Sequence, residues 1–162
     1  MIDLEKAIVL ATKAHKGQKR CNGEPYILHP LRIMMKMGND KERIVAILHD
    51  VFEDSDEDIH SINMNEDVKK VLILLTKNKD ENYIDYIKAI KKSNNPLLMK
   101  VKLADIRDNF YRLDKVKNQD FRNKLFNKYD KALKILIDED VVYGKLGAGL
   151  GKDEPHEIKI GE

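Results

Sequence analysis

Apolar residues recur at three- and four-residue steps along most of the chain, and no stretch alternates apolar and polar residues as a half-buried strand does. The first such pattern, over residues 4–14, predicts a helix that ends near Gly17. A second, from about Asp40 to Phe52, is apolar on nearly every side and predicts a helix in the centre of the fold. The fold class expected from these patterns is all-α, a compact multi-helix bundle in one domain.

Glycine and proline interrupt the helical pattern over residues 18–30, which predicts a structured loop there and a short helix over residues 31–38. Asn63 and Glu66 have the spacing of a capping box, and Asn95 with Pro96 is typical of a helix start. Four further helices are expected at residues 68–75, 83–90, 96–113 and 121–136.

The C-terminal end has a different composition, because five of the eight glycines lie from Gly144 onward. The glycines before Lys152 are spaced one residue too closely for a phosphate-binding loop, and Asp153 stands where Ser or Thr is needed. We therefore expect a domain at residues 1–143 and a Gly-rich, flexible tail at residues 144–162.

The charge balance excludes some partners. The 162 residues include 30 Lys plus Arg and 28 Asp plus Glu, a net charge of +2, which does not favour nucleic acid as a partner. No apolar run approaches the roughly 20 residues of a membrane span, and the N-terminus lacks the form of a signal peptide. A cytoplasmic protein is expected, and the single Cys21 agrees with a reducing compartment. The oligomeric state does not follow from the sequence.

His49 and Asp50 lie in the pattern predicted to be a central helix. An ionised Asp in an apolar setting costs several kcal/mol unless it is paired or binds a metal, so Asp50 is either a metal ligand or the partner of a basic residue. Glu53 and Asp54 follow one helical turn later, on the same side. They would handle protons beside a metal, or they form a solvated acidic helix end.

The expected helix after Pro96 has one polar face, which is either its solvent-exposed side or part of a binding site. Its members are Lys102, Asp105, Asn109 and Arg112.

His29, in the predicted loop, is either a ligand or a residue that fills the turn, whereas His15 is expected to pack in the core. Two imidazoles and two carboxylates together would make a mixed nitrogen and oxygen site suited to Mn²⁺, Fe²⁺ or Zn²⁺. This set comprises His29, His49, Asp50 and Asp105.

Four runs of sequence, in order, resemble the hydrolase domain of RelA/SpoT homologues, which belongs to the HD superfamily of metal-dependent phosphohydrolases. They are AHKGQKR at residues 14–20, GEPYILHP at 23–30, LHDVFEDS at 48–55 and VKLAD at 101–105, followed by Asn109. The resemblance covers roughly residues 3–137. It implies an HD-domain bundle of the kind found in the single-domain small alarmone hydrolases.

The resemblance also implies roles for individual residues. In that family one Mn²⁺ is bound by residues that match His29, His49, Asp50 and Asp105, although another divalent metal stays open. Glu53 and Asp54 match the catalytic acid pair, and Arg20 and Asn109 match residues that contact the nucleotide. Lys102 and Arg112 are expected partners of phosphate groups on helix geometry alone.

The reaction of the family removes pyrophosphate from the 3′ position of the stringent-response alarmone (p)ppGpp, so a small-molecule nucleotide is the expected partner. Cys21 stands where the alarmone enzymes usually carry a basic residue. An HD phosphatase for another nucleotide, such as NADPH or a nucleoside phosphate, is therefore the alternative. A non-catalytic nucleotide-binding module is a further alternative.

Overall fold

The start of each longer helix is set by a short polar side chain. The side chains of Asp3, Asn39, Asn82 and Asn95 each accept a backbone N–H bond in the first helical turn that follows. Asn65 does the same for the helix that begins at Glu66, so the predicted capping box with Asn63 is wrong. The cap is decided by which side chain reaches the free N–H groups, and Asn65 is directly adjacent to them.

The computed structural model describes residues 1–137, and in this range the chain is all-α as predicted, with no strand and one isolated bridge between Lys19 and Pro25. The predicted tail at residues 144–162 and the predicted domain end at residue 143 lie outside the described residues. The α-helices are α1 (Leu4–Ala14), α2 (Leu28–Met34), α3 (Asp40–Leu48), α4 (Val51–Asp54), α5 (Glu66–Leu75), α6 (Tyr83–Lys92), α7 (Pro96–Tyr111) and α8 (Gln119–Ile137). Two 3-10 turns are η1 (Ile59–Ser61) and η2 (Leu113–Lys115).

Several helix boundaries differ from the sequence prediction, for example α2 ends at Met34 rather than residue 38 and α7 at Tyr111 rather than residue 113, and two of the differences affect the candidate metal ligands. Helix α2 begins at Leu28 rather than residue 31, because Pro30 fits the first turn, where its missing N–H is not needed. The predicted continuous helix over residues 40–52 is divided into α3 and α4 at His49 and Asp50. His49 Nδ1 lies 2.8 Å from the carbonyl oxygen of Ala46, which a continuous helix would use for the N–H of Asp50.

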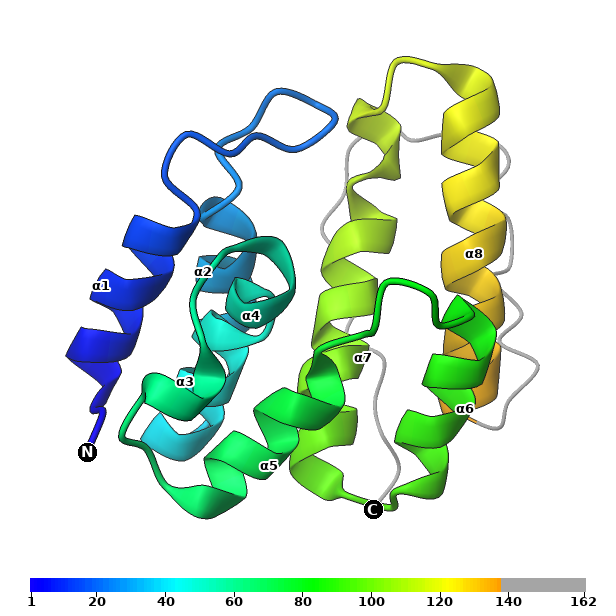
Figure 1. Ribbon diagram of the computed structural model, residues 1–162. Coiled ribbons are helices and arrows are strands. Elements are labelled where there is room, and N and C mark those ends of the chain that lie inside the picture. The colour runs from blue at the N-terminus through cyan, green and yellow to red at the C-terminus, as the bar shows by residue number, and fades with distance from the viewer. Residues whose placement is uncertain (138–162) are drawn as a thin grey trace.

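Helix α7 lies between two groups of helices, with α1 to α4 on one side and α6 and α8 on the other (Figure 1). Helix α3 is central as predicted, because residues 45–48 are fully buried among α1, α2, α5 and α7. The largest fully buried apolar side chains of the described core come from six helices, and they include Ile33, Ile47, Leu72, Ile87, Leu98 and Leu133. None of the helices within residues 1–137 combines the length and the apolar character needed to cross a membrane.

Candidate metal centre and adjoining pocket

The four predicted metal ligands converge from different elements of the bundle. His29 lies in the first turn of α2, His49 and Asp50 lie between α3 and α4, and Asp105 lies on α7. His29 Nε2 is 3.2 Å from Asp105 Oδ1 and 3.7 Å from Asp50 Oδ2. His49 Nε2 is 3.0 Å from Asp50 Oδ2 and 3.8 Å from Asp105 Oδ1. Both imidazoles therefore direct the same nitrogen toward the same two carboxylates.

This group of side chains fits a divalent cation. Donor atoms of His29, His49 and Asp105 all lie within 4.8 Å of one another, and all three residues are buried. Among residues 1–137, His49 Nε2 makes no well-aligned hydrogen bond although it lies close to both carboxylates, whereas a buried nitrogen normally has a hydrogen-bond partner. Burial alone would lower the pKa of His49, but the carboxylates of Asp50 and Asp105 raise it to about 10. The cluster thus attracts positive charge, and its donor set suits Mn²⁺, Fe²⁺ or Zn²⁺.

The second nitrogen of each imidazole is held by the protein. His29 Nδ1 lies 2.8 Å from Asp108 Oδ2, and His49 Nδ1 lies 2.8 Å from the carbonyl oxygen of Ala46. Because these oxygens accept hydrogen bonds from Nδ1–H, a divalent metal would replace only the Nε2 proton, and Nε2 of both rings would then donate its lone pair into the cluster. The fold therefore sets the tautomer that a metal ligand requires.

Asp108 was missed by the sequence analysis, although it follows Asp105 by one turn of α7. Arg32 binds it in a bidentate manner, with Nε 2.9 Å from Oδ1 and Nη2 2.9 Å from Oδ2. The same guanidinium donates two bonds of 3.1 Å to Glu24 in the preceding loop. Burial alone would raise the pKa of Asp108, but the hydrogen bonds from His29 and Arg32 hold it well below its usual range.

Asp50 is fixed by Tyr26, another residue that the sequence analysis did not assign. Tyr26 Oη donates a bond of 2.6 Å to Asp50 Oδ2, the oxygen that faces both imidazoles. The Tyr26 ring packs 4.8 Å from the ring of His15, which is buried as predicted. The loop between α1 and α2 thus helps to orient a ligand that lies 24 residues away in the sequence.

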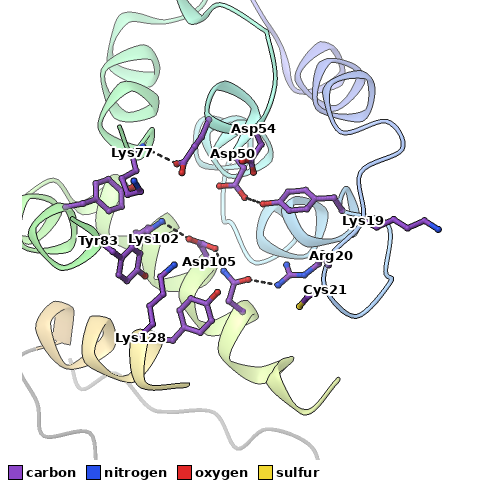
Figure 2. A pocket seen from close by; sticks show the side chains of 15 residues that line it. Lys19, Arg20, Cys21, Asp50, Asp54, Lys77, Tyr83, Lys102, Asp105 and Lys128 are labelled. Carbon is purple, nitrogen blue, oxygen red and sulfur yellow. Dashed lines mark hydrogen bonds and ion pairs between the residues drawn. The ribbon is translucent and has the colours of Figure 1, made fainter. Parts of the chain in front are cut away.

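A cavity of about 370 Å³ is lined by two of the four predicted ligands, Asp50 and Asp105, and the two buried imidazoles lie behind them. Figure 2 shows Asp50 and Asp105 between two walls, with Arg20 and Cys21 on one side and Lys77, Tyr83 and Lys128 on the other.

Glu53 and Asp54 line the cavity and remain partly exposed. Their partial burial, together with the charge of Asp50, raises the pKa of both carboxyls. Glu53 Oε2 also accepts the backbone N–H of Lys77 at 3.1 Å.

Arg20 and Asn109, the two residues matched to nucleotide contacts, both line the cavity. Arg20 Nη2 donates to Asn109 Oδ1 at 2.5 Å, and Asn109 Nδ2 donates to Asp105 Oδ1 at 2.6 Å. Lys102 also lines the cavity, but its Nζ is buried and lies 2.9 Å from Asp105 Oδ2. The nucleotide-contact candidates are therefore linked directly to a metal-ligand candidate.

Arg112 is not brought to this cavity. Its Nε lies 3.4 Å from Asp108 Oδ1, and its side chain lines a separate hollow with Leu28 and Met35. The polar face predicted on α7 is therefore divided, because a 16-residue helix extends beyond the cavity. Four residues of the opposite wall went unnoticed in the sequence, since they come from segments outside the recognised runs: Lys77, Tyr83, Lys128 and Tyr129.

Comparison with known proteins finds related chains, although no family model matches the chain. The guanosine-3′,5′-bis(diphosphate) 3′-pyrophosphohydrolase of Aquifex aeolicus is 36% identical over 121 residues, covering 66% of this chain. The GTP pyrophosphokinase rsh of Brucella melitensis is 30% identical over 161 residues, covering 95% of this chain. The chain is a relative of the RelA/SpoT homologues. It spans 17% and 21% of the length of these two relatives.

The fold agrees with this RelA/SpoT relationship. A solved structure described as a metazoan ortholog of SpoT that hydrolyses ppGpp superposes with a TM-score of 0.74. The alignment covers 83% of this chain and 85% of that chain at 20% sequence identity, a likeness that concerns the fold. The RelA/SpoT-like bundle expected from the four sequence runs is thereby confirmed.

Proposed function

We propose that this chain is a metal-dependent phosphohydrolase that removes pyrophosphate from the 3′ position of (p)ppGpp in the cytoplasm. The observation that carries the proposal is a cavity lined by Glu53, Asp54, Arg20 and Asn109 together with Asp50 and Asp105, the two carboxylates that adjoin the buried imidazoles. The names of the Aquifex and Vibrio cholerae relatives, which are 36% and 49% identical over 121 and 57 residues, describe this activity and support the choice.

The residues that would hold the metal are His29, His49, Asp50 and Asp105, and Mn²⁺ is the proposed ion. A bound divalent metal supplies a Lewis acid that polarises a phosphate and lowers the pKa of water. Glu53, helped by Asp54, would accept the proton of the attacking water, because both carboxyls line the cavity next to Asp50. Their raised pKa values bring them closer to neutral pH, where a general base is most effective.

Substrate binding is assigned to the wall that carries Arg20. The guanidinium of Arg20 is held by Asn109 and would stack on or hydrogen-bond a nucleobase. Asn109 would contact the nucleotide beside the metal, and Lys102 would offset phosphate charge while it remains paired with Asp105. Arg112 is not included, because it lies outside the cavity.

A second candidate function rests on Cys21. This residue lines the cavity next to Arg20 and is neutral, whereas the alarmone enzymes usually carry a positive charge there. An HD phosphatase acting on NADPH or a nucleoside phosphate is therefore the alternative. The non-catalytic module is disfavoured, since simple binding does not require an acid pair beside a complete ligand set.

A substrate panel tests the proposal directly. The purified chain is incubated with Mn²⁺ and ppGpp, pppGpp, NADPH or common nucleotides, and released phosphate and pyrophosphate are measured. Pyrophosphate release from ppGpp with formation of GDP supports the proposed function. Turnover of NADPH or another nucleotide without turnover of ppGpp supports the alternative, and no turnover of any of them supports the binding module.

A further inference from the structure

The cavity has a second polar wall, on the side opposite Arg20, that the proposed reaction does not yet use. It is formed by Tyr83 of α6 and by Lys128 and Tyr129 of α8, which we call the α6–α8 wall. Lys128 Nζ lies 4.1 Å from the centre of the Tyr83 ring and 5.6 Å from that of Tyr129. Figure 2 shows Lys128 extending past Tyr83 toward Lys102 and Asp105.

The polar groups of this wall have no protein acceptors within residues 1–137. In this range no carboxylate forms an ion pair with Lys128, and neither the Tyr83 nor the Tyr129 hydroxyl makes a hydrogen bond. The neighbouring tyrosines differ, because Tyr86 donates to the carbonyl oxygen of Leu75 and Tyr26 donates to Asp50. The ammonium group of Lys128 and the hydroxyl groups of Tyr83 and Tyr129 thus line one cavity, and their N–H and O–H donors have no acceptor within residues 1–137.

The surroundings of Lys128 favour a negative partner. Lys128 keeps solvent exposure at the cavity, and partial desolvation and the positive charge of Lys102 lower its pKa, whereas its contacts here are aromatic rings and no carboxylate of residues 1–137 pairs with it. Lys77, also in the cavity, directs its Nζ to the carbonyl oxygens of Asn78 and Glu81, which adds a further positive group to this side. An anion bound at the α6–α8 wall would supply the missing charge.

We propose that the α6–α8 wall binds a second phosphate group of the substrate, separate from the one that reacts at the metal. The inference rests on the proposed function, because it places the reacting phosphate between the two walls and the base against Arg20. A nucleotide that carries phosphate on both the 3′ and the 5′ oxygens of ribose can reach both positions at once. Lys128 is then a specificity residue that selects nucleotides with phosphate groups on both the 3′ and the 5′ oxygens of the ribose.

Binding can be measured without turnover by calorimetry with two probes, guanosine 3′-phosphate and guanosine 3′,5′-bisphosphate, each titrated into the full chain with Mn²⁺. We expect the wild type to bind the bisphosphate about tenfold more tightly or better, the usual scale for a hydrogen bond to a charged group. Lys128→Met keeps most of the apolar stem and removes the charge, so it should abolish this difference. Lys124→Met is the matched control and should keep the difference, because Lys124 is exposed on the same helix as Lys128 but does not line the cavity.

The outcomes separate this inference from the proposed function. A full preference for the bisphosphate in Lys128→Met would overturn the role of Lys128, whatever the substrate. Equal binding of the two probes to the wild type would overturn the phosphate site and leave the nucleotide hydrolase standing. If the wild type binds neither probe and hydrolyses no ppGpp, both proposals fail. Partial losses of the preference in Tyr83→Phe and Tyr129→Phe would support the full wall.

Discussion

His29 Nδ1 and Asp108 Oδ2 lie 2.8 Å apart inside the bundle, where both side chains are almost fully buried. Asp108 therefore fixes the imidazole in the tautomer that directs Nε2 to the proposed metal. We expect Asp108→Ala to weaken Mn²⁺ binding about 10- to 100-fold, the usual effect of removing such an outer partner. Calorimetric titration of the metal measures this directly.

The control for this prediction is Asp108→Asn, whose side-chain oxygen can still accept a hydrogen bond from Nδ1–H of His29. It should bind Mn²⁺ more tightly than Asp108→Ala. Circular dichroism separates loss of the tautomer from loss of the fold, since Arg32 keeps only Glu24 as a partner in Asp108→Ala, whereas the Asn oxygen can still accept its Nη2–H. Unchanged Mn²⁺ affinity in a folded Asp108→Ala would show that His29 needs no such partner.

The ionisation of Asp108 also predicts a dependence of stability on pH. Although burial raises its pKa, the bonds from His29 and Arg32 lower it below the unfolded value of about 3.9. The ionised carboxylate therefore stabilises the folded state above about pH 4, and this contribution is lost as the pH falls toward the folded pKa. Between pH 5 and pH 3 the free energy of unfolding should fall more steeply for wild type than for Asp108→Asn. Urea denaturation at each pH tests this, and equal slopes would contradict it.

The helices could be predicted because their signals are local. Asn95 and Pro96 set the start of α7, and the apolar period of residues 4–14 set α1. The break at His49 and Asp50 could not be predicted, because it depends on a side chain that bonds to the carbonyl oxygen of Ala46. Periodicity reports which residues are apolar and carries no information about that bond.

The two walls of the cavity illustrate the same limit. Arg20 and Asn109 were found because they stand in runs of sequence that resemble a family, although 89 residues separate them. Tyr83 and Lys128 stand in no such run, and only the packing of α6 against α8 brings them together. Asp108 was overlooked because an Asp on a helix is usually solvated, and its burial follows from Arg32 on another helix.

The ligand assignment predicts that metal and activity are lost together. Asp50 Oδ2 faces both imidazoles, so Asp50→Ala should lower bound Mn²⁺ and abolish turnover. Metal content after dialysis, measured by mass spectrometry, checks the first effect. Asp56→Ala is the matched control in the same acidic run, since Asp56 is exposed and lies outside the main cavity. Full metal occupancy in Asp50→Ala would reject Asp50 as a ligand.

Cys21 allows the substrate proposal to be tested by adding a charge. If ppGpp is the substrate, Cys21→Lys should raise kcat/KM for ppGpp, because it restores a positive group beside Arg20 at the cavity wall. Cys21→Ser is the neutral control and should leave kcat/KM close to that of wild type. If the wild type and Cys21→Lys are both inert toward ppGpp but active on NADPH, the alternative function is favoured.

Glu53→Gln separates catalysis from metal binding. Glu53 lies on α4, after the break at Asp50, and its Oε2 accepts the Lys77 N–H, a bond that the amide oxygen of Gln can also accept. The variant should therefore retain its fold and bound Mn²⁺ but lose roughly two to four orders of magnitude in kcat, the range for a general acid-base group. Asp54→Asn, which removes the assisting carboxylate, should lose less. Near-normal turnover in Glu53→Gln would mean that the role of Glu53 is only to accept the Lys77 N–H. Loss of bound metal together with activity would instead make Glu53 a metal ligand or a residue that holds a metal ligand in place.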